Sequence, residues 1–464
     1  MIGEMNMDNS YNRRTISIAA IALCACIVLS VLFMLLFSKD SSLFPVVIVA
    51  IYLVFLADSN ALNYITYPGV TLFLAITTIK YIVLPIGMII TGVWTTNTSI
   101  IGNILYVYEE IAVSVVMKIL LIRKYKLNRA ERSRVSEIDS NGYQFFVVLI
   151  VAAVIILIIH PHVLGKFSFS FMDSDEYTLS RVSTGLSGVE SVIFNLGKLM
   201  LPVVVCIFLN RRNISENVKY YLSFALLIVF NGVFISGTSR NSAIIPAVAG
   251  MYTLITLFPQ YKKRSLILSF GFIAAVVVSL SLLKAAALGS SSFNSINGFI
   301  NYLSVYFSGP ESTKVSVDTY KIFGTASFST RLADIFGNLP GLSSRFDLEN
   351  RTSTFYNIIY YSGASNRSKI IPMVGQGLMH FGYVFSVVPS ILCLIAMAHF
   401  DTMTKRTVNL TGVFIVSYAA VRCAMSMMSN FSILFSAFYS VIIPLLVLDY
   451  LSRKVKFWSR LHIR

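Results

Sequence analysis

Two apolar runs meet at Gly232-Val-Phe-Ile-Ser-Gly-Thr-Ser-Arg-Asn-Ser-Ala-Ile-Ile-Pro246. The polar letters between them, from Ser236 to Ser242, are typical of a tight turn between two membrane helices. Arg240 lies in that turn. An arginine at the edge of a membrane bundle is costly unless it meets water, a partner or an anionic ligand, so Arg240 is a candidate functional residue.

The same turn has the composition of an anion-binding site. Gly237, Thr238 and Ser239 supply backbone N–H groups and hydroxyls, and Asn241 or Ser242 can cap the helix that follows. A helix N-terminus beside a guanidinium favours anionic ligands. The alternative is an ordinary hairpin whose arginine anchors to lipid headgroups.

The composition is that of a membrane protein. Of the 464 residues, 56% are hydrophobic and only 12% are charged, with a mean hydropathy of +0.75. In typical soluble domains, about a quarter of all residues are charged. The net charge of +16 could suggest nucleic acid, but the basic residues lie mainly in short loops between apolar runs. That placement is the orientation signal of membrane proteins, so we predict no nucleic-acid partner.

Hydropathy predicts an all-α polytopic membrane protein with about twelve transmembrane helices, since a span needs about 20 apolar residues. The expected domains are a bundle over residues 1–284, an extracytoplasmic loop or cap over 285–372, and three last helices with a basic tail over 373–464. The spans are expected near 15–37, 42–57, 68–91, 100–122, 143–160, 189–209, 219–236, 241–258, 265–284, 373–399, 409–428 and 431–450.

Lysines and arginines alternate from loop to loop as the positive-inside rule requires, with Lys39 as an exception. Both termini are therefore predicted to be cytoplasmic, and the Arg240 turn is predicted to face outward. The bilayer is one expected partner.

Residues 285–371 form the longest connection in the sequence. Structureless loops of this length are uncommon, so we expect a partly helical cap that carries function. Its aromatic residues and arginines would suit a sugar–phosphate substrate. The alternative is a solvated lid without ligand contacts. The candidate substrate-binding cations are Arg331, Arg345, Arg351 and Arg367.

Several ionisable side chains fall inside predicted spans, where they usually pair or mark a path. Lys80 and the adjacent Glu109 and Glu110 lie at matching depths of consecutive spans, which favours a structural ion pair over a proton or ion relay. Glu190 lies near the outer end of the sixth span, and Arg422 lies about two turns below the outer end of the eleventh.

His380 lies in the tenth span with Gln376 one turn above it on the same face. A histidine inside a helix can act as a base or serve only as a packing residue, and both interpretations stay open.

No metal or cofactor is predicted. All five cysteines lie inside apolar runs and have no zinc or disulfide spacing. Asp173-Ser-Asp175 in the first long outer loop could hold a divalent cation, but so short a pattern favours a solvated turn.

Twelve spans, a large outer loop before the last three, Ser236-Gly-Thr-Ser-Arg-Asn-Ser242 and Gly375-Gln-Gly-Leu-Met-His-Phe-Gly382 form a recognisable order. Together they resemble the bacterial oligosaccharide repeat-unit polymerases (Wzy type), relatives of the O-antigen ligases with a GT-C-like bundle. That family commonly carries a carboxylate and an asparagine where Gln376 and His380 stand here.

The resemblance implies a glycosyltransferase of the bacterial inner membrane. Such an enzyme transfers a glycan from undecaprenyl pyrophosphate to the end sugar of an incoming lipid-linked repeat, building O-antigen or capsule. A membrane protein that regulates chain length is a further expected partner.

The implied reaction needs cations for the leaving pyrophosphate, a base or hydrogen-bond acceptor for the acceptor hydroxyl, and a lipid-open groove at the outer leaflet. Arg240 with Ser239 and Asn241, Arg422, and the loop arginines can supply the first. Candidates for the base are His380, His162, Glu190 and the Asp173/Asp175/Glu176 cluster.

Two other classes share features with this reading. An O-antigen ligase shares the fold and the chemistry but hands the glycan to lipid A core. A flippase of lipid-linked repeats also has about twelve spans, but it has short outer loops, which the 285–371 segment contradicts.

Overall fold

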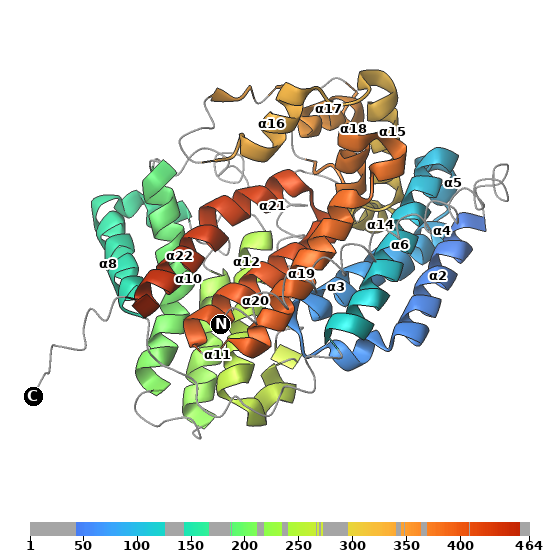
Figure 1. Cartoon of the computed structure of the whole chain (residues 1–464). Coiled ribbons are helices and arrows are strands. Elements are labelled where there is room, and N and C mark those ends of the chain that lie inside the picture. Colours follow the sequence, from blue (N-terminus) through green and yellow to red (C-terminus); the bar gives the residue numbers. More distant parts are fainter. Residues whose placement is uncertain are drawn as a thin grey trace, which may run out of the picture. The chain divides into compact units, whose positions relative to one another are not determined.

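The computed structural model describes residues 43–125, 143–166, 186, 188–210, 218–233, 240–265, 267–268, 271, 296–339, 345–347, 349–362, 369–407 and 409–454 (Figure 1). Every regular secondary-structure element found in these ranges is a helix. They belong to two compact units. The first combines residues 1–132, 294–402 and 423–436, and the second combines 133–293, 403–422 and 437–464. The first unit therefore draws on all three of the sequence ranges expected as domains.

The N-terminal helices of the first unit pack through buried aromatic side chains. α2 packs against α6, and α3 runs through a π-helical turn into α4. Tyr52, Tyr81 and Tyr106 lie fully buried between these helices. Burying such a side chain contributes roughly 1.5–3 kcal/mol each to stability. The helices are α2 Phe44–Ser59, α3 Pro68–Thr78, the turn Ile79–Val83, α4 Leu84–Ile90, α5 Trp94–Asn97 and α6 Ile100–Leu120.

Local signals explain several of these ends. Pro68 stands at the first position of α3, where a missing N–H costs nothing. The next two N–H groups, of Gly69 and Val70, donate to the Asp401 carboxylate at 2.8 and 3.0 Å. The Ser99 side chain accepts from the N–H of Gly102 and caps α6.

The predicted cap is helical in the residues described. It contains α14 Ile296–Tyr306, α15 Pro310–Phe323, α16 Phe328–Phe336 and α17 Thr352–Tyr360. α15 packs against α6, α17 and α18, and most of the side chains that it buries are polar, among them Ser312, Thr313 and Ser316. The helical prediction is confirmed, and the cap is packed onto the N-terminal helices (Figure 1).

The tenth predicted span, 373–399, is not one continuous helix. α18 Met373–Phe385 and α19 Val388–Arg406 are bent by 108° at the break between them. Gly382 has φ 73°, which only glycine adopts without strain. A Cβ atom on Gly377 would lie 1.9 Å from the carbonyl oxygen of Ser386, so glycine also permits the close approach of the bend.

A second break follows α20 Leu410–Ala424. The 3₁₀ turn Met425–Met428 leads to α21 Phe431–Ala437, a π-helical turn at Phe438–Ile442 and α22 Ile443–Lys454. The Asn430 side chain caps α21 by accepting from the N–H of Ile433 at 2.9 Å. Phe431 and Ser432, which follow this break, contact His380 and Gln376 of α18.

The second unit contains two helix pairs that pack along their lengths. α8 Gln144–Ile159 packs against α10 Gly188–Asn210, and α11 Val218–Val233 packs against α12 Arg240–Leu257. The α8–α10 contact is apolar, with Ala153, Ile156 and Phe194 buried in it. α12 begins at Arg240, inside the turn predicted over 236–242. Arg240, Asn241 and Ser242 therefore belong to the first turn of this helix, and neither Asn241 nor Ser242 precedes it as the predicted cap.

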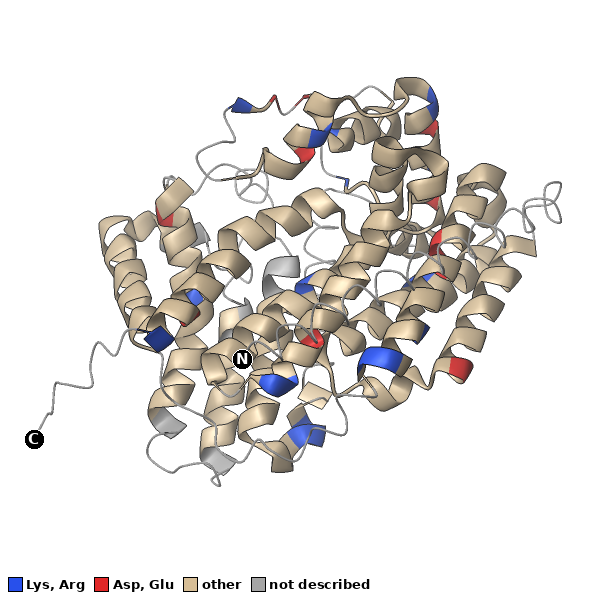
Figure 2. Ribbon diagram, in the orientation of Figure 1, with Lys and Arg blue, Asp and Glu red and all other residues tan. Residues whose placement is uncertain are grey.

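Four of the described helices are long and apolar enough to cross a membrane, or five if the bent pair counts as one span. Figure 2 shows how sparse charged residues are along the helices. This is the architecture of a helical membrane protein, while the full number of about twelve spans stays a prediction. The predicted span 15–37 and most of 265–284 lie outside the described residues. The four helices are Pro68–Ile90, Gly188–Phe208, Leu410–Met428 and Phe431–Lys454.

Candidate functional site

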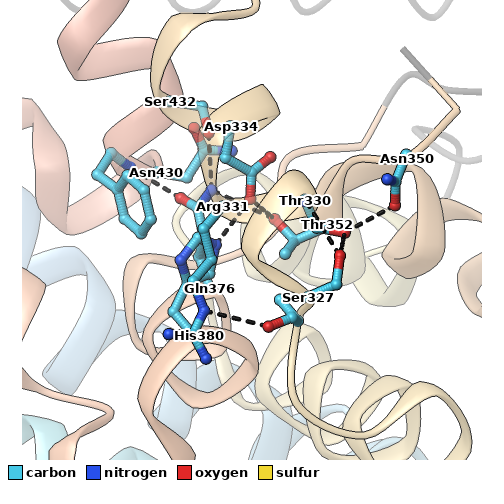
Figure 3. Close-up of polar contacts among 12 residues, drawn as sticks. Ser327, Thr330, Arg331, Asp334, Asn350, Thr352, Gln376, His380, Asn430 and Ser432 are labelled. Carbon is cyan, nitrogen blue, oxygen red and sulfur yellow. Dashed lines mark hydrogen bonds and ion pairs between the residues drawn. The ribbon is translucent and has the colours of Figure 1, made fainter. Parts of the chain in front are cut away.

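A buried carboxylate–imidazole pair lies at the centre of the candidate site, within the first unit. Nε2 of His380 lies 2.8 Å from Oδ2 of Asp334, and the two side chains are 2% and 0% exposed (Figure 3). His380 comes from the buried face of α18, and Asp334 comes from the short amphipathic helix α16. A buried pair of this kind has to be hydrogen-bonded well, because burying a charge otherwise costs several kcal/mol.

Thr352 and Gln376 extend this pair into a chain of hydrogen bonds. The Thr352 hydroxyl donates to Oδ2 of Asp334 at 2.6 Å and accepts from Nε2 of Gln376 at 3.3 Å. The same Gln376 amide nitrogen donates to the Ser432 hydroxyl at 2.7 Å. Its carbonyl oxygen accepts from the backbone N–H of Phe431 at 3.0 Å.

The contacts decide which imidazole nitrogen is available. Oδ2 of Asp334 accepts hydrogen bonds, so the proton of a neutral His380 lies on Nε2. Nδ1 then carries the lone pair and can accept a proton from a substrate hydroxyl. The Phe431 ring packs edge-on against the imidazole, with centroids 4.8 Å apart, and holds its plane. This arrangement is that of a general base oriented by a carboxylate.

Arg351, the residue just before α17, has a guanidinium group that is only partly hydrogen-bonded. Its Nη1 donates to Oδ1 of Asn338 at 2.8 Å. Its Nε and Nη2 are buried and have no hydrogen-bond partner among the described residues, and the same is true of Oδ1 of Asp334. Burial lowers the pKa of the Arg351 guanidinium, and the Asp334 carboxylate opposes that shift.

Nε and Nη2 form the edge of a guanidinium that binds carboxylates and phosphates with two parallel hydrogen bonds. A Cβ atom at position 337 would lie 2.2 Å from Nη2 of Arg351, so Gly337 leaves the space that the guanidinium fills. Arg351 is therefore a candidate anion-binding residue, next to α17 in the same unit as the His380–Asp334 pair.

Arg331 lies in the same segment, but its described contact is structural. Its Nε donates to the carbonyl oxygen of Ala326 at 3.1 Å, just before α16 begins. Thr330 and Asn350 tie α16 to the start of α17 through a 2.7 Å hydrogen bond (Figure 3). Arg345 is exposed, and Arg367 lies outside the described residues.

The remaining candidates belong to the second unit. Glu190 lies 3.6 Å from Nε2 of His160, at the start of α10. Arg422 is in the last turn of α20. Arg240 begins α12, but its side chain and that of Asn241 are outside the described residues, as is Ser239. His162 has its ring centroid 5.7 Å from that of His160. The Asp173/Asp175/Glu176 cluster also lies outside the described residues.

The predicted ion pair inside the first unit is confirmed. Nζ of Lys80 lies 2.6 Å from Oε2 of Glu109, with both side chains buried. Glu109, and not Glu110, is the partner.

Sequence reasoning did not identify Asp334. It is separated from His380 by 46 positions and stands in Phe328-Ser-Thr-Arg-Leu-Ala-Asp-Ile-Phe336, where it reads as one polar residue among several. The available signal was helical spacing, since Thr330, Ala333 and Asp334 share the buried face of α16. A carboxylate on the buried face of a helix predicts a partner from another element.

Within the described ranges, no group of three or more His, Cys, Asp or Glu side chains could hold a metal ion. Comparison with family models, with curated proteins and with solved structures gives no match to this chain.

Proposed function

We propose that this protein is a membrane glycosyltransferase that polymerises undecaprenyl-pyrophosphate-linked oligosaccharide repeats into a surface polysaccharide, O-antigen or capsule, at the outer face of the inner membrane. The observation that supports this most is the buried His380–Asp334 pair, in which the contact with Asp334 leaves a lone pair on Nδ1 of the imidazole. Asp334 belongs to the segment predicted to lie outside the membrane, and His380 belongs to the predicted span that follows it. Glycosyl transfer is accelerated by a base or hydrogen-bond acceptor for the acceptor hydroxyl, and His380 can serve as that group.

In the proposed reaction, the acceptor hydroxyl oxygen attacks the anomeric carbon of the donor sugar. Its proton passes to Nδ1 of His380 as the new glycosidic bond forms. The bond between that carbon and the pyrophosphate oxygen breaks, and its electron pair leaves with undecaprenyl pyrophosphate. Asp334 stabilises the resulting imidazolium, since the two groups are 2.8 Å apart.

The leaving pyrophosphate gains negative charge and needs cations. Arg351 supports this role because two of its guanidinium nitrogens, Nε and Nη2, have no hydrogen-bond partner among the described residues. Arg240 is proposed for the same role because it begins α12, where the helix N-terminus adds its own positive potential. Thr352 donates to Asp334 and accepts from Gln376 of α18, so these two residues fix the position of Asp334 relative to α18.

A deletion strain complemented with variants tests the function. The wild-type gene should restore a ladder of long surface polysaccharide, and His380→Ala should leave only short capped glycans although the protein is present at normal levels. His399→Ala provides the matched control, because this histidine lies on α19 outside the cluster.

Other glycan phenotypes of the deletion would contradict the proposal. Long chains that stay unattached would indicate a ligase, and repeats retained on the cytoplasmic side would indicate a flippase. A full ladder from His380→Ala would remove the base from the mechanism.

A further inference from the structure

Three ionisable side chains lie together inside the helices of the first unit, away from the His380–Asp334 pair. Lys80, Glu109 and Glu110 are each 0% exposed. Lys80 comes from the π-helical turn between α3 and α4, and the two glutamates are adjacent on α6. One ammonium therefore faces two carboxyl groups in a water-poor interior.

Glu109 has its hydrogen-bonding needs met. Its Oε2 accepts from Nζ of Lys80 at 2.6 Å, and its Oε1 accepts from the Ser390 hydroxyl at 3.1 Å. Ser390 lies in the first turn of α19, just after the bend. This carboxyl is therefore the natural ionised partner of Lys80.

Glu110 is different. Both of its carboxyl oxygens are buried and have no hydrogen-bond partner among the described residues. The charged groups that act on it are Lys80, which is already paired with Glu109, and Glu109 itself. An ionised carboxylate in this position would combine the full desolvation penalty with repulsion from its neighbour.

The other groups that face Glu110 are the phenols of Tyr52, Tyr81 and Tyr106. The Tyr52 hydroxyl lies 2.6 Å from that of Thr77, and the Tyr106 hydroxyl donates to the carbonyl of Lys80 at 2.6 Å. The Tyr81 hydroxyl is buried with no hydrogen-bond partner among the described residues. These neutral groups supply no second positive charge.

We propose that Glu110 is a proton-binding site, and that its carboxyl group is protonated in the folded state described here. A bound proton makes the cluster neutral, with one ammonium, one carboxylate and one carboxylic acid. A bare cation is a poor substitute, because the Lys80 ammonium beside it would repel it. This inference does not depend on the proposed glycosyl transfer.

The site is connected to both helix breaks. Nζ of Lys80 also lies 3.4 Å from the carbonyl oxygen of Met427, in the 3₁₀ turn just before α21, and Ser390 ties Glu109 to α19. Loss of the proton would leave two carboxylates competing for one ammonium. That competition would draw Lys80 away from Met427, on the segment whose Phe431 holds Gln376.

Infrared spectroscopy of the purified protein in mildly alkaline buffer tests the proposal, because exposed carboxyl groups are ionised there. The spectrum of wild type minus Glu110→Gln should contain the carbonyl stretch of one carboxylic acid. Lys80→Met should show a stronger acid band than wild type, since it leaves two carboxyl groups without a cation. Absence of the acid band from the wild-type minus Glu110→Gln difference overturns the inference.

Thermal unfolding gives an independent check. Glutamine is a neutral isostere of protonated glutamate, so Glu110→Gln should have the melting temperature of the wild type at neutral pH. A large drop in the melting temperature of Glu110→Gln would mean that the wild-type carboxyl is ionised and paired, and would also overturn the inference.

Discussion

At the scale of single residues, the candidate site depends on which nitrogen of His380 holds a proton. Asp334 accepts from Nε2 and so keeps Nδ1 unprotonated. Asp334→Asn preserves the shape but presents an amide N–H to the imidazole, which favours the opposite tautomer. We expect this variant to lose activity by about a hundredfold or more, the usual contribution of a general base.

The measurement for Asp334→Asn is the polysaccharide ladder in the complemented deletion strain, read against protein level. Asp318→Asn is the matched control, because Asp318 is a partly exposed carboxylate of α15 whose described ion pair is with Lys321. Normal chain lengths from Asp334→Asn would show that the Asp334–His380 contact is structural only.

Arg240 carries a second prediction at this scale. A guanidinium can bind two pyrophosphate oxygens in parallel, whereas an ammonium binds as a point charge. Arg240→Ala should abolish polymerisation with normal membrane insertion, and Arg240→Lys should restore only part of the activity. If Arg240 is merely a lipid-headgroup anchor, lysine will work as well as arginine, and wild-type chain lengths from Arg240→Lys would favour that alternative.

At the scale of elements, the Lys80–Glu109 pair joins the turn after α3 to α6, and Ser390 extends it to α19. Lys80→Met removes the cation from the buried Glu109 carboxyl group, which must then take up a proton or stay charged without a partner, and should destabilise the protein by about 3–5 kcal/mol. The double variant Lys80→Met/Glu109→Gln should recover most of that loss. The measurement is thermal or denaturant unfolding in detergent.

Lys118→Met is the matched control for that experiment. Lys118 also lies on α6 but pairs with Asp58 of α2, and its side chain is 39% exposed. Exposed pairs contribute about 0–1 kcal/mol, so this variant should unfold almost as the wild type does. Equal losses from Lys80→Met and Lys118→Met would show that burial does not make the first pair special.

The element scale also shows what the sequence could predict. Apolar run lengths placed the helices of residues 44–59, 100–120 and 144–159 within a few residues. The span predicted at 241–258 also matches α12 closely, but the helix begins inside the predicted turn. The break between α18 and α19 was not predicted, because Gly382 in an apolar run gives no sign of the positive φ that it adopts.

The candidate site was predictable only in part, because some of its residues meet through tertiary packing and not through local spacing. Gln376 and His380 share a helix face and could be grouped from their spacing. Asp334 and Thr352 reach them through the packing of α16 and α17. Helical spacing places Asp334 on a buried face, but it does not specify which residue of another element is the partner.

At the scale of the whole molecule, the remaining prediction concerns orientation in the membrane. Charge alternation between short loops predicts both termini inside and residues 285–371 outside.

Single cysteines at exposed positions test this orientation. Lys321 lies on α15 in the predicted outer segment, and Asn63 lies in the predicted inner loop after α2. A membrane-impermeant maleimide added to intact cells or spheroplasts should label Lys321→Cys and not Asn63→Cys. Permeabilised cells should label both, which controls for accessibility. Among the described residues, Cys206, Cys393 and Cys423 are buried, and labelling of the unsubstituted protein measures the background of the native cysteines. The reverse labelling pattern would place His380 and Asp334 on the cytoplasmic side, where no outward-facing lipid-linked acceptor could reach them, and the proposed polymerase would fail with the topology.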